Sequence, residues 1–263
     1  MGSLRLAVLN IKKNIANAKE LKLSFMITIF GMAINNISFL IIWYYFGKTV
    51  GIINGWKPLD IFGLYGFSTT AYGIISSVFA GIFDIPTYIT NATLDNFLLT
   101  PKNILLKIST SKVRTSAFGD LLFGIICFIV FTVSNKFTFI QYLLSLLLII
   151  IVSIVFYSFS LFSMTVSFYL MDGHNVSNGL YGIFVSNSIY HGGAFTGILR
   201  LVFIILVPSL VVGALPVELV KDFSLMKLLV IGLIAIFWGV ISVSFFYKSL
   251  KRYDSNSLFG FGS

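Results

Sequence analysis

Few residues in this chain are of a type that carries catalytic or metal chemistry. The two histidines, His174 and His191, lack the Cys, Asp or Glu neighbours at ligand spacing that a metal site needs. The nine acidic residues lie mostly in loops and at the ends of apolar runs, without a nucleophile elbow or a paired acid and base. The single Cys127 offers neither a disulfide framework nor a thiolate cluster. We therefore expect no catalytic or metal site, and the chain is not predicted to be an enzyme.

Gly47-Lys48-Thr49 looks like the end of a phosphate-binding loop. That loop also needs a glycine five residues before Gly47, but Ile42 stands there inside an apolar run. We expect no nucleotide site and no cofactor in this chain. If ATP drives the protein, another polypeptide must bind the ATP and its Mg²⁺.

Asp120 and Arg200 are the two ionisable residues that could lie inside an apolar segment. Both can instead lie near a membrane interface, where snorkelling or a partner accommodates the charge. A guanidinium beside an apolar run costs at least ~2.5 kcal/mol at membrane depth unless it is paired or interfacial. The candidate partners of Arg200 are Glu218 and Asp222.

The composition places these residues in a membrane protein. Hydrophobic residues make up 57% of the chain and charged residues only 10%, whereas a soluble domain has about 25% charged residues. Long charge-free runs need the bilayer as their solvent. The net charge of +9 comes mostly from cations beside these runs, so it reports orientation and not nucleic-acid binding. We predict an all-α membrane protein with a six-span helical bundle.

Five spans follow directly from the apolar runs. They cover residues 23–46, 61–83, 117–134, part of 137–171, and 228–247. The remaining span falls in a Pro-broken segment, 175–217, and two interpretations stay open there. Either an interfacial stretch precedes a span at 198–215, or a short span at about 180–196 precedes a re-entrant, Pro-broken hairpin.

Three polar segments are expected on the cytoplasmic side. Residues 1–22 predict a helix that lies on the membrane surface, because apolar and basic positions alternate at helical spacing; an ordinary basic lead-in to the first span is the alternative. The loop 84–116 is too charged to span, and 248–263 form a tail. These segments hold five, four and three Lys or Arg, against two, one and two in the opposite connections. Both termini are therefore predicted to be cytoplasmic in a multi-pass protein of the plasma membrane.

One loop sequence resembles a family motif. Residues Ala92-Thr93-Leu94-Asp95-Asn96-Phe97-Leu98-Leu99-Thr100-Pro101 resemble a Gly-x-Leu-Asp-x-x-Leu-Leu-Arg-Pro motif of permeases in the type-2 ATP-binding-cassette (ABC) family. Ala92 and Thr100 depart from the usual Gly and Arg.

Two further features follow in the family's order. Ile198-Leu199-Arg200, followed by Pro208 and Pro216 among apolar residues, resembles a second signature, and residues 250–255 resemble the family's tail. His191-Gly192 stands where Tyr-Pro is common. Together the three matches cover nearly the whole chain, so residues 1–263 are expected to form a single permease domain.

The resemblance implies two permease subunits side by side, identical or paralogous, with two cytoplasmic ABC ATPase subunits docked on the loop after the second span. Membrane lipid is the other expected partner. The residues assigned to ATPase coupling are Leu94, Asp95, Leu98, Leu99 and Pro101. The residues assigned to a gate or pathway are Arg200, Pro208 and Pro216.

The loop motif also makes physical sense as a docking element. A short amphipathic helix with Leu94, Leu98 and Leu99 on one side and Asp95 exposed fits a contact in a protein groove. A helix that rests on the bilayer is the alternative.

The leading functional hypothesis is an ATP-driven exporter that moves an amphipathic or hydrophobic cargo, such as a drug, a peptide or a lipid-like molecule, by alternating access. One rival is a membrane anchor or sensor that recruits a cytoplasmic partner without transport. The other is an ion-coupled secondary transporter.

Overall fold

A computed structural model describes residues 2–20, 22–99 and 102–253. Its regular structure in these ranges is helical, apart from one isolated bridge between Ile53 and Trp56. The all-α prediction is confirmed for this part of the chain.

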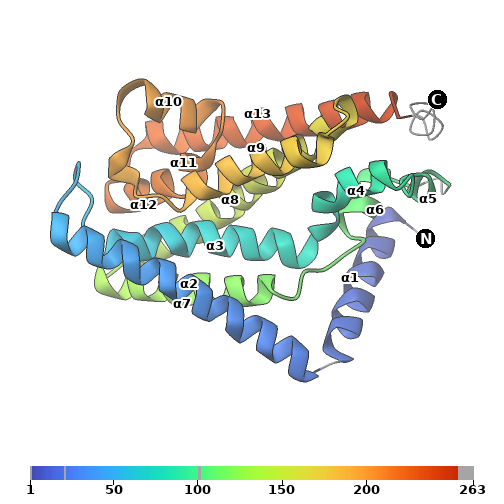
Figure 1. Cartoon of the computed structure of the whole chain (residues 1–263). Coiled ribbons are helices and arrows are strands. Elements are labelled where there is room, and N and C mark those ends of the chain that lie inside the picture. The colour runs from blue at the N-terminus through green and yellow to red at the C-terminus, as the bar shows by residue number, and fades with distance from the viewer. Residues whose placement is uncertain (1, 21, 100–101, 254–263) are drawn as a thin grey trace.

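Six long helices form a bundle (Figure 1). They are α2 (Lys22–Val50), α3 (Asp60–Val78), α7 (Ala117–Ser134), α8 (Phe139–Thr165), α9 (Gly173–Ser188) and α13 (Leu225–Leu250). A short helix η2 (Val166–Tyr169) extends α8. By length and composition, α2, α7, α8 with η2, and α13 can each cross a membrane. The six-span prediction is therefore confirmed only in part.

A fifth span is possible if α3 is counted together with the bent segment that follows it. The chain turns by 77° after α3, into η1 (Ala80–Asp84) and α4 (Ile85–Thr90). The straight span expected at 61–83 is thus wrong at its end. The remaining span was expected within residues 175–217. The helix found there, α9, has only 16 residues, whereas about 20 are needed to cross the hydrocarbon core.

Glycines bring α3 and α7 into backbone contact. A Cβ atom added to Gly73 would lie 2.7 Å from the Cα of Leu121, and one added to Gly66 would lie 2.9 Å from the Cα of Phe128. Small residues at such positions let membrane helices approach closely. On the other side of α3, aromatic rings join α8 to α9 and α13, with Phe159 centred 4.7 Å from Phe184 and 4.8 Å from Trp238.

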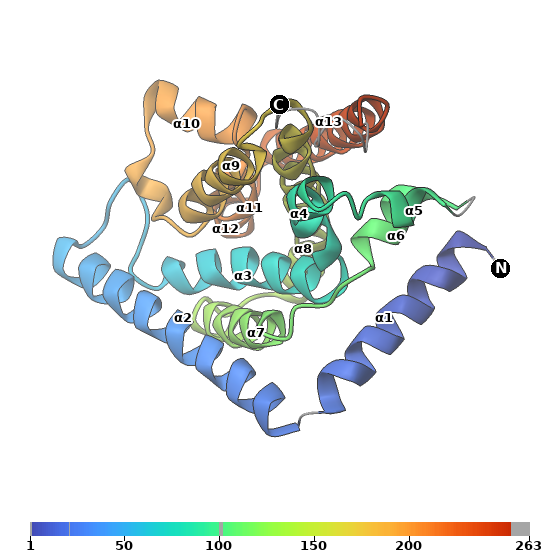
Figure 2. The ribbon, with the colours of Figure 1, turned by 45° about the vertical axis from the view of Figure 1, so that its right-hand side comes forward.

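One end of the bundle carries the polar loop, and we call it the α4–α6 end. It holds η1, α4, α5 (Asp95–Leu98), α6 (Ile104–Ser109), α1 (Ser3–Glu20) and the last turn of α13 (Figure 1). Here α1 runs across the direction of the bundle instead of along it (Figures 1 and 2). The Asn14 side chain donates to the carbonyls of Thr110 and Ser111, at 3.2 and 3.0 Å, and so joins α1 to the residues after α6.

The opposite end, called the α10–α12 end, holds the connection between α2 and α3 and the broken segment (Figure 1). That segment contains η3 (Gly192–Ala194), α10 (Gly197–Ile205), α11 (Ser209–Val212) and α12 (Ala214–Lys221). A continuous span at 198–215 is wrong, because three short helices share those residues. The alternative, a helix followed by a Pro-broken hairpin, is closer, although the helix begins earlier than residue 180.

Candidate functional site

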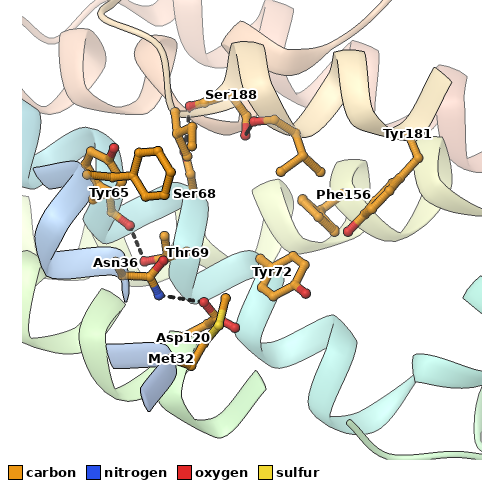
Figure 3. A pocket seen from close by; sticks show the side chains of 13 residues that line it. Met32, Asn36, Tyr65, Ser68, Thr69, Tyr72, Asp120, Phe156, Tyr181 and Ser188 are labelled. Carbon is orange, nitrogen blue, oxygen red and sulfur yellow. Dashed lines mark hydrogen bonds between the residues drawn. The ribbon is translucent and has the colours of Figure 1, made fainter. Parts of the chain in front are cut away.

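A cavity of 220 Å³ lies inside the bundle. Figure 3 shows side chains from α2, α3, α7, α8 and α9 around it. Aromatic and aliphatic side chains form most of its wall, namely Met32, Phe39, Tyr65, Tyr72, Phe156, Tyr181, Val185 and Ile189. The remaining lining residues are polar, namely Asn36, Ser68, Thr69, Asp120 and Ser188. An apolar pocket with a few convergent polar groups is the usual form of a small-molecule site.

Asp120 is the one charged residue among the described side chains that line this cavity. The amide of Asn36 donates to its Oδ1 at 2.6 Å, while Oδ2 is buried without a partner in the described part of the chain. Only 3% of the residue is exposed. Of the two ways expected to accommodate Asp120, snorkelling or a partner, the structure shows a partner, Asn36. The polar Asn36 in the middle of an apolar run was the signal that sequence reasoning missed.

A hydrogen bond and a close backbone contact connect the cavity wall to the α10–α12 end. Ser68 on α3 donates to the carbonyl of Ser188, the last residue of α9, at 2.8 Å. Gly213, between α11 and α12, packs on the same carbonyl, and an added Cβ atom would lie 2.0 Å from it. The junction of α11 and α12 therefore packs directly behind two residues of the cavity wall, Ser68 and Ser188.

Arg200 on α10 pairs with Glu218 on α12. Its guanidinium donates to Glu218 Oε2 at 2.6 Å, and the indole of Trp56 donates to Oε1 at 3.3 Å. The two charged side chains are 30% and 18% exposed. Of the two candidate partners of Arg200, Glu218 is the one the structure pairs with it, and Asp222 is not.

A second ion pair ties α12 to the first residue of α3. Lys221 donates to the Asp60 carboxylate and, at 3.3 Å, to the carbonyl of Gly55. The backbone N–H of Lys57 donates to the same carboxylate oxygen at 2.7 Å. Asp60 is only 1% exposed, so its carboxylate is shielded from water at the start of α3. Sequence reasoning placed Asp60 only as a bracket of the second span.

His191 and Asn54 complete the packing at this end. His191 is 2% exposed, its Nδ1 accepts from the N–H of Gly193 at 3.2 Å, and its ring is centred 5.3 Å from that of Trp56. Burial lowers the pKa of His191, and the nearby Asp60 carboxylate offsets this only in part. The Asn54 amide donates to the carbonyl of Gly193 at 2.7 Å. These contacts hold the connection after α2 against the segment after α9.

The two prolines assigned to the gate are both buried. Pro208 directly precedes α11, and Pro216 is the third residue of α12. Because proline cannot donate a backbone hydrogen bond, Pro208 ends the run of α10 and lets the chain turn back.

The coupling residues are divided between the core and the surface. Leu94 is fully buried, whereas Leu98 is 47% and Leu99 is 80% exposed, and Asp95 is partly exposed. The expectation that Leu94 shares the docking face of Leu98 and Leu99 is wrong, because its side chain enters the core. Pro101 lies outside the described residues.

The expected short amphipathic helix holds only part of the motif, because Leu94 and Leu99 flank α5 and are not in it. Between Thr90 and residue 100 only the four residues of α5 are helical, and α6 begins at Ile104. The segment nevertheless packs firmly on the bundle. A Cβ atom added to Gly81 would lie 1.8 Å from the carbonyl of Ile108, Lys112 pairs with Asp84 at 3.0 Å, and the hydroxyls of Ser109 and Tyr157 lie 2.8 Å apart.

The described residues contain no group of three or more His, Cys, Asp or Glu side chains placed to hold a metal ion. Comparison with protein families gives a match between residues 32–257 and the model of the family described as "ABC-2 family transporter protein". Searches of curated proteins and of solved structures gave no match.

Proposed function

The chain belongs to the ABC-2 family of transporter proteins, and from that premise we propose that it is the permease subunit of an ATP-driven exporter. It moves an amphipathic or hydrophobic cargo out of the cytoplasm, and a separate ATPase subunit binds and hydrolyses the ATP. The family consists of membrane subunits, and the apolar helices of this chain agree with a multi-pass membrane protein.

The observation that carries this proposal is the course of α3. Its first residue, Asp60, is in the ion pair with Lys221, and its middle residues Tyr65, Ser68 and Thr69 line the cavity. Its last turn leads directly into η1, which packs on α6. One rigid helix therefore connects the α10–α12 end, the cavity and the α4–α6 end.

This connection supports an alternating-access mechanism. When the ATPase subunits bind ATP, they move the α4–α6 segment, and α3 moves with it because η1 cannot slide past α6. Movement of α3 relative to α12 separates Asp60 from Lys221 and opens the cavity at the α10–α12 end. The Arg200–Glu218 pair holds α10 to α12, and together with Pro208 and Pro216 it forms the proposed gate on that side. A ligand shifts such an equilibrium only through its different affinity for the two states.

The proposed docking face for the ATPase consists of Leu98 and Leu99, with Asp95 at its edge. Two large apolar side chains that the described part of the chain leaves exposed gain most when a protein groove covers them. In this arrangement the α4–α6 end, both termini and α1 lie on the cytoplasmic side of the plasma membrane, as the distribution of Lys and Arg favours.

A second permease subunit, identical or paralogous, completes the proposed transporter, together with two ATPase subunits. The helix α2 is the candidate surface for the second permease subunit. Only 11% of the apolar stretch of this helix is buried against the rest of the described chain. Lipid covers whatever part of that surface the second subunit leaves free.

Proteoliposomes that contain the chain and its partner ATPase test the proposal. We expect movement of a fluorescent lipophilic probe that requires ATP and stops when ATP hydrolysis is blocked. A membrane anchor or sensor predicts no movement of any cargo. An ion-coupled transporter predicts uptake by this chain alone when an ion gradient is imposed, without ATP.

A further inference from the structure

The buried carboxylate of Asp120 has a hydrogen-bond donor but no counter-charge. Asn36 donates to one oxygen, and the other has no partner in the described part of the chain, although an ionised carboxylate can accept several hydrogen bonds. No Lys, Arg or His is among the described residues that line the cavity. The nearby cation Arg114 lies instead over the ring of Phe83, 4.5 Å from its centroid. A charge at membrane depth is costly unless it is paired.

The walls around this carboxylate are aromatic. Tyr65, Tyr72, Phe156 and Tyr181 present rings to the cavity, and Figure 3 shows Asp120 and Asn36 at one end of it with Phe156 and Tyr181 across from them. The hydroxyls of Tyr65 and Tyr181 are buried without partners in the described structure. Aromatic faces attract cations, and quaternary ammonium groups are often held in such cages.

The other walls suit an apolar group. Met32, Val185 and Ile189 add aliphatic surface to the wall of the cavity. A molecule that matches the whole cavity has a cationic nitrogen at one end and an apolar body at the other.

From this combination we propose that the cavity binds amphipathic cations, with Asp120 as the counter-ion, Asn36 as the residue that positions its carboxylate, and the aromatic side chains as the cage. The proposal rests on the proposed function, since it names the chemical class of the cargo, but binding can be measured without transport.

The test measures binding of radiolabelled benzyltrimethylammonium to the full-length chain in nanodiscs. We expect saturable binding to the wild type, and at least about tenfold weaker binding to Asp120→Asn, which keeps the shape of the side chain and removes its charge. Asp222→Asn is the matched control, because it removes an equal charge from an exposed position on the α10–α12 side, and its binding should equal that of the wild type.

A second measurement does not depend on any variant. Neopentylbenzene has the same shape as the probe with carbon in place of the charged nitrogen, and it partitions more strongly into lipid. If the charge matters, this neutral molecule competes at least about tenfold more weakly despite its higher concentration in the bilayer. Equal competition, absence of saturable binding to the wild type, or unchanged binding to Asp120→Asn would each overturn the proposal.

Proteoliposomes with the partner ATPase separate this inference from the proposed function. ATP-driven movement of neutral and anionic amphiphiles, with cations excluded, would leave the exporter function intact and refute the cation site. Asp120-dependent binding of the cation without any ATP-driven movement would refute the exporter function and leave the site intact.

Discussion

Replacing Lys221 by Met should open the α10–α12 end of the cavity. The substitution removes the cation from the Asp60 carboxylate but keeps a flexible side chain of similar length. Asp60 then keeps only the N–H of Lys57 among its described partners. Because Asp60 is 1% exposed, its charge stays away from water as long as this end is closed.

The size of the effect follows from that burial. Removing one partner of a buried ion pair costs ~3–5 kcal/mol, since the other charge stays buried without compensation. The remaining hydrogen bond to Asp60 places this case near the lower limit, at about 3 kcal/mol. Opening hydrates the carboxylate, so the penalty falls on the closed state alone. With about 1.4 kcal/mol for each factor of ten, the ratio of open to closed protein should rise about a hundredfold.

Accessibility of a cysteine in the cavity measures this ratio. Ile189 lines the cavity, and Ile189→Cys in a Cys127→Ser background provides a single thiol. The initial rate of alkylation by a membrane-impermeant reagent, added outside sealed cells, is proportional to the open fraction while that fraction is small. We expect the rate to rise by up to about a hundredfold when Lys221→Met is added.

The matched control is Lys48→Met, which removes an exposed cation from the same end of the bundle. It should leave the rate unchanged. An unchanged rate in Lys221→Met, in protein that elutes and melts like the wild type, would refute the role of the Asp60–Lys221 pair in closing the cavity. If Lys48→Met raises the alkylation rate as much as Lys221→Met does, the increase results from the change in net charge and not from loss of the Asp60–Lys221 pair.

Three further predictions concern packing, coupling and topology. Gly73→Leu should lower the melting temperature in detergent, because its side chain meets the backbone of α7 and overpacking costs ~1–3 kcal/mol. Replacing Leu98 and Leu99 with Asp should reduce recovery of the ATPase in a pull-down well over tenfold, because each lost leucine contact costs ~2 kcal/mol or more of binding free energy. The membrane spans of this variant should still insert. A cysteine at Asn54 should react with an impermeant reagent in sealed cells, and one at Asn103 should not.

Each of these has its own control and opposing result. Gly179→Leu adds the same side chain to open space, and an equal loss of stability there would remove the close-packing argument. Asn96→Asp adds a charge to α5 without removing a leucine, and undiminished ATPase recovery with the double leucine variant would exclude this surface from coupling. Labelling at Asn103 from outside would reverse the orientation.

The sequence predicts those elements whose limits are set by charge and turn residues. The run 117–134 coincides with α7, and 228–247 lies within α13, because polar residues bracket both and the bilayer favours continuous helices between them. The Arg200–Glu218 pair could also be predicted, since a guanidinium beside apolar residues needs a partner.

Other features depend on contacts between distant segments. The turn after Val78 and the burial of Leu94 arise where η1 and the loop pack against α6 and the core, which no local pattern encodes. Likewise, Asp120 and Asn36 meet because the neighbouring Gly119 lets α7 approach the backbone of α2, where a Cβ atom would meet the carbonyl of Ile29. The candidate cavity therefore could not be assembled from the sequence, although Asn36 and Asp120 each stand out within an apolar run.

Purification of the chain from its native membrane, with identification of every stoichiometric partner, tests the central claim most directly. The account predicts a co-purifying chain with a complete phosphate-binding loop, in equal amount to the permease, and ATP hydrolysis that the cargo stimulates. Recovery of the chain without any nucleotide-binding partner, together with gradient-driven transport by this chain alone, would contradict it.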